Sequence, residues 1–411
     1  MKSSNSLLGA AAALVLSTAP AFSLGIRIGG QNAEATARGD AFAATADNPS
    51  AVYYNPAGIT QLEGTRALLG SSATTLRVRV DPETPGASAF SNRNTELQFA
   101  PTFFVTTKPK NSPLAFGLGI YAPYGLGLEY PDDTPFRTTA RKGKILYVAI
   151  NPVVAWKIHD TLSIAAGPSI NYGSAELQQG GIAVGDTFKF KGDGLSYGWS
   201  AGLKWDPHRM HHFGITYHSA AAITFSGHTT QRADPFTVAT PFGPFPVAGI
   251  DRREDADAEF HIPQNIVFGY SFTPTPDWNF EFNADWTDWG DLNTVTLHQQ
   301  RSGNIHVPYN WQASWFWEFG VTKKFKDGWQ ASVGYIWSEN SVPEDSFNPI
   351  VPDSNRHVLS AGLGQKRAHF SWHLAYQWAY GPTRTINQGT SSDGRYRAHG
   401  NTLNLTFGYD F

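Results

Sequence analysis

Few residues of this sequence are placed to carry out metal or nucleophilic chemistry. His208, His211 and His212 follow Asp206 closely, and these residue types can serve as ligands for zinc. They fall in a tight turn between two predicted strands, where solvated polar side chains are common, so we expect no metal site. Ser and His residues could meet in space, but we expect no strand-to-helix nucleophile elbow, and the sequence has no P-loop. The sequence therefore predicts neither an enzyme nor a cofactor.

Basic residues could hold a ligand that carries a carboxylate group, because a carboxylate binds best beside a cation. We expect these residues to lie near one end of the molecule, most of them as solvated charges. The candidates are Arg77, Arg79, Arg141, Lys142, Lys144, Lys189 and Lys191.

The composition favours strands and turns. The 411 residues include 40 Gly, 13 Trp, 16 Tyr and 27 Phe, whereas only 16% are charged. Aromatic residues suit strands and membrane interfaces, and Gly suits turns. No apolar run reaches the roughly 18 residues that a membrane-spanning helix needs. The formal net charge of −3 gives no overall excess of cations, so we expect no nucleic acid partner.

The start of the sequence has the parts of a secretion signal. Lys2 precedes an apolar run from Leu7 to Leu16, and Ala19-Pro20-Ala21 supplies the small residues of a cleavage site. We therefore predict a signal peptide over residues 1–21 and a mature protein outside the cytoplasm. The sequence contains no cysteine, so disulfides and thiol chemistry are excluded.

Residues 22–63 are small and turn-rich and cannot build a core alone. Segments 33–37 and 40–46 could each form a short helix, but neither has a wide apolar face. Further on, Asn55 can cap a helix that begins at Pro56, because the first helical position needs no N–H. We predict that this segment is a plug, called the hatch below, that needs walls supplied by the rest of the chain.

The remainder of the chain alternates apolar and polar residues, as strands do when one face is in an apolar environment. Every second residue between Trp278 and Trp286 is apolar. Trp329 and Trp337 end one apolar row, about 26 Å apart along the strand. Once the strand is tilted, this separation is close to that of the two aromatic girdles of a membrane barrel, whereas a soluble core usually buries its Trp in mid-strand.

Short and long connections alternate along this part of the chain. Tight turns such as 159–160 are followed by long polar segments such as 178–194 and 226–258. Short turns on one rim and long loops on the other are typical of outer-membrane barrels. The sequence thus predicts an all-β fold, a 14-stranded antiparallel transmembrane barrel over residues 64–411 with the hatch in its lumen.

The last residues fit the same class of protein. From Leu403 to Phe411 every second residue is apolar, and the chain ends in an aromatic residue. Bacterial outer-membrane barrels commonly end in this way, and the barrel assembly machinery reads the terminal strand. We therefore predict a monomer in the bacterial outer membrane, in contact with its lipid and recognised by the assembly machinery through Phe411.

With these features the chain resembles the FadL-type family of outer-membrane transporters for long-chain fatty acids and other hydrophobic compounds. Three segments carry the resemblance: AFAATADNPSAVYYNPAGIT is similar to the family's hatch motif, NFEFNADWTDWGDL to its ninth strand, and GWQASVGYIWSENSVPEDSFNPIVPDSNRHVLSAGL to a strand, a Pro-rich loop and the following strand. The resemblance implies passive uptake. Substrate would enter an outer pocket, pass into the lumen and leave sideways into the membrane through a gap beside a kinked third strand.

The third predicted strand, residues 113–122, has its own reason to bend. Gly weakens strand pairing and Pro removes a ladder donor, and both residue types occur in and just after this segment. We expect the hatch and this strand to gate the passage through Asn55, Pro56, Ala57, Gly117, Gly119 and Pro123.

The predicted lumen is less polar than that of a water-filled porin, which suits an apolar ligand. The expected ligand contacts are Phe104, Tyr121, Ile145, Tyr147, Val153 and Phe316. Long-chain fatty acids are the expected substrate. Aromatic or alkane hydrocarbons are an alternative, because the predicted loop 178–194 is shorter than its counterpart in the fatty acid transporters. A nonspecific porin is a second alternative.

Overall fold

The computed structural model describes residues 26–93, 98–181, 183–240 and 243–411, and the predicted signal peptide lies outside them. The fold is a closed antiparallel barrel of 14 strands, as the sequence predicts. The barrel strands are β1 (Gly64–Pro82), β3 (Gln98–Lys108), β4 (Leu114–Glu129), β5 (Lys142–His159), β6 (Leu162–Gly180), β7 (Thr187–His208), β8 with β9 (His211–His218 and Ala221–Ala233), β12 with β13 (Ile250–Ile262 and Asn265–Thr275), β14 (Trp278–Thr287), β17 (Ser314–Lys324), β18 (Trp329–Ser338), β19 (Arg356–Arg367), β20 (Phe370–Tyr380) and β22 (Gly394–Asp410).

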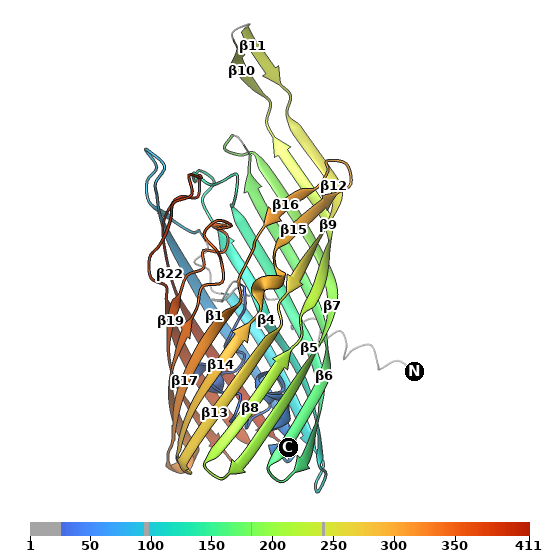
Figure 1. Cartoon of the computed structure of the whole chain (residues 1–411), viewed down its shortest axis with the longest axis vertical. Helices are drawn as coiled ribbons and strands as arrows, with labels where there is room; N and C mark the ends of the chain where they lie inside the picture. The colour runs from blue at the N-terminus through green and yellow to red at the C-terminus, as the bar shows by residue number, and fades with distance from the viewer. Residues whose placement is uncertain (1–25, 94–97, 182, 241–242) are drawn as a thin grey trace.

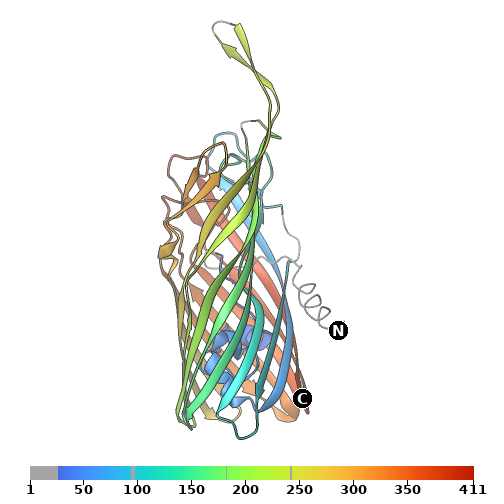
Figure 2. The ribbon, with the colours of Figure 1, turned by 90° about the vertical axis from the view of Figure 1, so that its right-hand side faces the viewer.

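The first and last strands close the barrel. β1 pairs with β22 without a break, from Arg66 opposite Asp410 to Pro82 opposite Gly394. Figures 1 and 2 show the strands tilted around one axis, with short turns at the end that holds the C-terminus and longer segments at the other end. The short segments at the long-loop end are β2 (Phe90–Ser91), β15 (Thr294–Gln299), β16 (Ile305–Pro308), β21 (Arg384–Ile386) and the hairpin of β10 (Phe236–Thr240) and β11 (Gly243–Val247).

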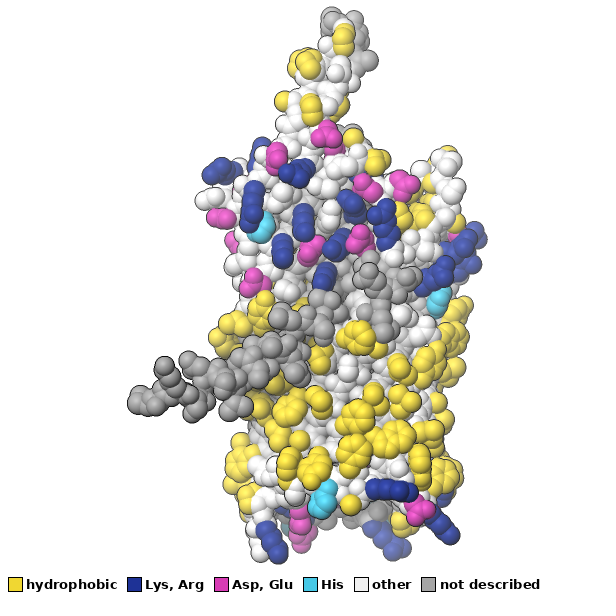
Figure 3. Space-filling view, turned by 180° about the vertical axis from the view of Figure 1, so that it is seen from behind, with side chains coloured by type: hydrophobic (Ala, Val, Ile, Leu, Met, Phe, Trp, Pro, Cys, Tyr) yellow, Lys and Arg dark blue, Asp and Glu magenta, His cyan; other side chains and the backbone are white. Residues whose placement is uncertain are grey.

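Apolar side chains cover the outside of the lower barrel as a belt. Trp199, Val333, Leu363 and Phe407 belong to it and are each more than 40% exposed, although they are large and hydrophobic. Figure 3 shows this belt with charged side chains above and below it. An apolar band flanked by polar rims is the surface that a membrane barrel presents to lipid.

The long-loop end contains more strand than the sequence suggested. The segment predicted as loop 178–194 is mostly β6 and β7, which pair up to Gly180 opposite Thr187 and leave only a short turn. The predicted loop 226–258 likewise contains parts of β9 and β12 and the β10–β11 hairpin. These predictions were wrong because polar residues can continue a backbone ladder above the membrane, where an apolar face is no longer needed.

Residues 26–63 lie inside the barrel near the short-turn end, as Figures 1 and 2 show in blue. This part of the hatch contains the helices α2 (Ala33–Ala37) and α3 (Ala51–Tyr54) and the 3₁₀ helix η1 (Pro56–Gln61). Of the two segments that could form short helices, 33–37 does so as α2, whereas 40–46 does not. Gly39, Asp40 and Ala46 have positive φ angles of 65°, 58° and 39°, which interrupt a right-handed helix. In the part of the chain that the structure describes, no helix is long and apolar enough to cross a membrane.

Candidate functional site

Two connected apolar pockets lie inside the long-loop end of the barrel. The outer pocket encloses about 680 Å³ and the inner one about 480 Å³, and part of this space is open to solvent. Both are lined by Leu177, Phe190, Ala258, Val295, Tyr309 and Ile350. Because they share these walls, the pockets form one continuous apolar surface for a ligand, which we call the outer apolar pocket.

A loop clamp lies close in sequence to Thr139 and Gln179, which line the outer apolar pocket. Arg137 donates to the carbonyl oxygens of Gly181 and Asp186, in the turn between β6 and β7, and to the Asp132 carboxylate at 3.1 Å. Burial alone would raise the pKa of Asp132, but hydrogen bonds from Arg137 and the Gly185 N–H, with the nearby Arg charges, hold that pKa below its usual value. Asp132 is therefore ionised at neutral pH and holds the two loops together.

Aromatic residues lead from the outer apolar pocket into the barrel. The Trp289 ring packs edge-on against Trp311, with centroids 5.0 Å apart, and against Tyr124 at 6.2 Å. Tyr124 in turn contacts Tyr147 at 5.6 Å. Below them lies a cavity of about 450 Å³ that Tyr53 of the hatch also lines. We call it the aromatic cavity.

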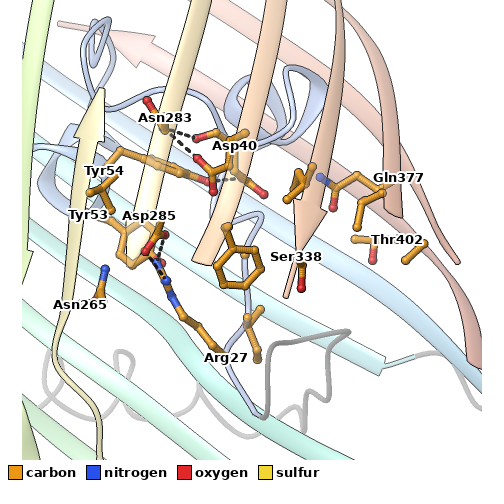
Figure 4. A pocket seen from close by; sticks show the side chains of 18 of the residues that line it. Arg27, Asp40, Tyr53, Tyr54, Asn265, Asn283, Asp285, Ser338, Gln377 and Thr402 are labelled. Atoms are coloured by element: carbon orange, nitrogen blue, oxygen red, sulfur yellow. Dashed lines mark hydrogen bonds and ion pairs between the residues drawn. The ribbon is translucent and has the colours of Figure 1, made fainter. Parts of the chain in front are cut away.

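A polar cavity of about 1040 Å³, part of it open to solvent, adjoins the aromatic cavity and lies between the hatch and the barrel wall. Arg27 forms an ion pair with Asp285 at 2.6 Å, and its guanidinium lies 5.3 Å from the centroid of the Phe316 ring. The hydroxyl of Tyr54 donates to Asp40 at 2.8 Å. Figure 4 shows these groups pointing toward one another from the hatch and from the strands. The hatch therefore joins the barrel through buried charges and is not held by apolar packing alone.

The predicted ligand residues separate into two groups. Tyr121 and Tyr147 line the aromatic cavity, Ile145 lines the outer apolar pocket, and Phe316 lines the polar cavity. The other two predicted residues, Phe104 and Val153, are buried in one cluster with hatch residues. The alternation of residues correctly predicts that all six side chains face inward. It does not distinguish a residue that lines a cavity from one that packs against the hatch.

Several residues that line the cavities escaped the sequence analysis. Arg27 lies in a segment that was not assigned to a strand, and His218 was in a predicted strand without a motif. Glu318, which alternation predicts to face inward beside Phe316, does line the polar cavity. Asp285 faces inward by the same alternation, which was the signal that could have found it.

The ladder between β3 and β4 is unusually short. It runs only from Phe103 opposite Ile120 to Thr107 opposite Phe116. On its other side, β4 pairs with β5 up to Glu129, with a one-residue bulge between Tyr121 and Tyr124. β4 therefore leaves β3 at Ile120 and continues outward beside β5 alone.

The start of the hatch covers part of the edge that β4 exposes. The N–H of Ile28 donates to the carbonyl of Pro123 at 2.8 Å, and the N–H of Gly125 donates to the carbonyl of Ile26 at 2.8 Å. Pro123, predicted as a gating residue, lies in the bulge and lines the aromatic cavity. The hatch, the bulge and the end of the β3–β4 ladder thus meet at one place in the wall.

The two predicted gating glycines of β4 lie against the hatch. A Cβ atom on Gly117 would come within 2.7 Å of a methyl group of Val52, and one on Gly119 within 3.0 Å of the other. Both distances are shorter than ordinary van der Waals contacts. Glycine is needed at these positions because the hatch helix α3 approaches the backbone of β4 closely.

The predicted hatch residues act as an anchor between hatch and wall. The Asn55 side chain accepts from the Ala57 N–H at 3.1 Å, as expected for a cap, and donates to the carbonyls of Ala43 at 2.8 Å and Leu203 of β7 at 3.0 Å. Pro56 begins η1, as predicted. Asn55, Pro56 and Ala57 are all buried.

The basic residues selected from the sequence lie at the long-loop end, but most of them face outward. Lys142 and Lys189 both pair with Glu176, at 2.9 Å and 3.1 Å, and Arg79 pairs with Asp81 at 3.4 Å. Lys142 also borders the outer apolar pocket.

The residues first considered for metal or nucleophilic chemistry serve structural contacts in the described chain. His212 pairs with Asp206 at 2.7 Å, and His211 with the Tyr270 hydroxyl at 2.8 Å. The sequence analysis missed one Gly-x-Ser-x-Gly segment, Gly194 to Gly198, which matches the spacing of a nucleophile elbow. This segment lies within β7 and not at a strand-to-helix turn. Its serine is 3.1 Å from the Tyr147 hydroxyl.

Solved structures of similar fold come from outer-membrane proteins. A FadL homologue of Pseudomonas aeruginosa superposes with a TM-score of 0.80 at 20% identity, covering 94% of this chain and 100% of that one. The toluene transporter TodX of Pseudomonas putida gives a TM-score of 0.75 at 15% identity, covering 95% and 100%.

Sequence comparison extends the likeness to the whole chain. The long-chain fatty acid transport protein of Escherichia coli K12 is 21% identical over 414 residues, covering 89% of this chain and 90% of that protein. Outer membrane protein P1 of Haemophilus influenzae is 21% identical over 434 residues, covering 90% and 91%. The family model described as outer membrane protein transport protein (OMPP1/FadL/TodX) matches residues 13–411. The chain therefore belongs to the OMPP1/FadL/TodX family of outer-membrane transport proteins.

Proposed function

We propose that this outer-membrane transporter takes up long-chain fatty acids passively and releases them sideways into the membrane beside β4. The observation that carries the proposal is the early end of the β3–β4 ladder at Ile120, next to a bulge whose residues Tyr121, Pro123 and Tyr124 line the aromatic cavity. A substrate in that cavity lies behind a wall that lacks backbone hydrogen bonds to β3.

The outer apolar pocket supports an extended apolar substrate. Its walls are mostly aliphatic and aromatic, with a few polar residues in the outer part, and it continues toward Trp311 and Ile26. Lys142 at its border can attract a carboxylate. Relatives named long-chain fatty acid transport proteins match most of the chain, which agrees with this choice.

Transfer of the acyl chain from water into apolar surroundings would drive the passage, since burial of each CH₂ group gains about 0.8 kcal/mol. The hatch would act as the gate, because Tyr53 lines both the aromatic cavity and the polar cavity, and Tyr54 lines the polar cavity. Membership of a family of transport proteins also agrees with the expectation that the protein is not an enzyme.

Aromatic hydrocarbons are the second candidate substrate. The cavity below the outer apolar pocket is lined by Tyr53, Tyr121, Tyr124 and Tyr147, and aromatic rings favour edge-to-face contacts with such walls. A nonspecific porin is disfavoured, because the packed hatch fills the barrel where a porin would leave a water channel.

Deleting Pro123 tests the lateral exit. The deletion removes the extra residue of the β4 bulge, so that β4 can continue straight beside β3. We expect uptake of labelled oleate to fall at least about tenfold in cells that have this chain as their only such transporter. Deleting Pro274 is the matched control, since it removes the extra residue of a second bulge, between Phe272 and Thr275, beside the short turn that joins β13 to β14.

The two deletions and two substrates separate the alternatives. If the variant without Pro123 still folds as a barrel and takes up oleate as before, the lateral exit is rejected. Uptake of labelled toluene without oleate would move the assignment to hydrocarbons. Free passage of small sugars, with neither apolar compound taken up, would assign the protein to the porins.

A further inference from the structure

Four lysines gather on the outside of the barrel at its long-loop end. Lys144 of β5 and Lys191 of β7 lie on either side of Glu176 of β6 in one cross-strand row. Lys142 and Lys189 occupy the next row outward. We call these four residues the lysine cluster. By alternation they are on the outer face, because the lumen-facing neighbours along the same strands are buried.

The charges of the lysine cluster are only partly neutralised. Glu176 accepts from both Lys142 and Lys189. Lys144 and Lys191 make no ion pair in the described part of the chain. Two more acidic residues lie on this outer face: Asp193, two residues nearer the belt on β7, and Glu129 of β4, directly opposite Lys142. The four lysines therefore exceed the three carboxylates of Glu176, Asp193 and Glu129 by one positive charge.

Four arginines form a second cluster where the barrel closes. Arg79 of β1 lies directly opposite Arg397 of β22, and both contact Asp81. The other two members, Arg77 and Arg395, make no ion pair among the described residues. Like charges directly opposite on neighbouring strands destabilise a sheet unless an anion compensates them. We call these four residues the arginine cluster.

Both clusters lie on strands whose outer faces become apolar nearer the barrel middle. Leu195 and Tyr197 follow Lys191 on the outer face of β7 and are 57% and 71% exposed. The step of four positions from Lys191 to Leu195 corresponds to about 13 Å along the strand. Figure 3 shows Lys and Arg side chains above the apolar belt. A molecule that carries anionic groups above acyl chains would match both surfaces at once.

We propose that the two clusters bind the phosphate groups of an acylated, phosphorylated glycolipid in the outer leaflet, whose acyl chains then lie against the belt. Lysine and arginine both bind phosphate, and the guanidinium can donate two parallel hydrogen bonds to it. Of the eight residues in the two clusters, Lys142 also borders the outer apolar pocket, whereas the other seven line none of the pockets described above. These seven are therefore not placed to hold the carboxylate of a transported substrate.

The glycolipid would frame the opening proposed above without taking part in transport. The arginine cluster is on β22 and β1, which lead to β3, and the lysine cluster begins on β5, next to β4. Lys144 pairs with Gly127, three residues farther out along β4 than Tyr124. This consequence alone rests on the proposed function; binding of the glycolipid does not.

A variant in four residues tests the proposal while leaving Glu176 and Asp81 paired. It changes only the cations without ion pairs: Lys144→Gln, Lys191→Gln, Arg77→Gln and Arg395→Gln. The probe is a bisphosphorylated, acylated glucosamine disaccharide, and binding to the purified barrel in detergent is measured by native mass spectrometry. We expect an affinity at least about tenfold weaker than that of the unchanged protein.

The matched control removes the same number of lysines and arginines from the short-turn end: Lys110→Gln, Lys326→Gln, Arg209→Gln and Arg367→Gln. These residues are exposed and make no ion pair in the described chain. The control variant should bind the phosphorylated probe as tightly as the unchanged protein does. A dephosphorylated probe should bind the unchanged protein only weakly, with the affinity that the four-residue variant has for the phosphorylated probe.

Heat-modifiable migration on gels verifies that both variants fold as barrels. Equal affinity of the folded four-residue variant and the unchanged protein would overturn the proposal. An equal loss in the control would reduce it to a general effect of charge and would also overturn it. Displacement by inorganic phosphate at the concentration of the probe would reject the lipid as the source of the phosphate groups.

Discussion

Arg27 joins the hatch to the barrel wall through a buried charge. It pairs with Asp285, 258 positions along the chain, and donates to Thr287 at 2.8 Å. Asp40 and Glu318 line the same cavity, so the surroundings are acidic. A buried ion pair adds little net stability, but removing one partner leaves the other charge unpaired, at a cost of about 3–5 kcal/mol.

Arg27→Gln should therefore loosen the hatch within an intact barrel. We expect the free energy that holds the hatch in place to fall by about 3 kcal/mol, measured as faster proteolysis of the hatch in the folded protein. The double variant Arg27→Gln with Asp285→Asn should recover part of this loss, because no carboxylate is then left without a partner. Equal protease sensitivity of the single and double variants would contradict the role of the ion pair.

Among the elements, the hatch segment from α3 to η1 links the cavities to the wall. Asn55 stands between the two helices and bonds to β7, and Tyr53 and Tyr54 directly before it line the cavities. The close approach is visible at Gly202, where a Cβ atom would collide with the Asn55 side chain. The position of these tyrosines thus depends on the anchor at Asn55.

Asn55→Ala with Pro56→Ala should leave the barrel folded but lower uptake. Without the Asn55 amide, the buried carbonyls of Ala43 and Leu203 lose a hydrogen-bond donor, which lowers the stability of the hatch by about 1–3 kcal/mol. We expect oleate uptake to fall more than about threefold, measured beside heat-modifiable migration of the barrel. Glu63→Ala, an exposed change just after η1, serves as the control. Unchanged uptake in the double variant would refute the gating role.

The whole molecule depends on the closure between β1 and β22. Phe411 follows the last paired residues, and its N–H donates to the carbonyl of Thr65 at 2.9 Å, while its side chain is 74% exposed. One backbone bond at the end of so long a ladder contributes little to the finished barrel. The exposed ring is therefore free to serve recognition during assembly.

Deleting Phe411 should lower the amount of barrel in the outer membrane without destabilising the barrels that form. We expect at least about a fivefold loss of heat-modifiable protein in outer-membrane fractions, with the midpoint of thermal unfolding of the purified barrel shifted by less than about 2 °C. Phe325→Ala, which removes an exposed aromatic ring at the same rim, is the control. A normal yield after deletion would refute recognition through Phe411.

The sequence by itself determined the class of fold and the strands of the barrel. Alternation has a period of two residues, so one register places every side chain of a strand on the lipid or the lumen side. The helix cap at Asn55 and the glycines of β4 could also be identified from the sequence, because they depend on local backbone chemistry. The loops 178–194 and 226–258 were misjudged, since polar residues do not reveal where pairing stops.

Only the tertiary structure decided which inward residues line a cavity and which touch the hatch. Phe104 and Tyr147 have the same pattern in the sequence, and the position of the hatch separates them. The pair of Arg27 and Asp285 and the end of the β3–β4 ladder arise from segments that meet through folding. Contacts between distant segments depend on the closure of the whole barrel, which no local pattern encodes.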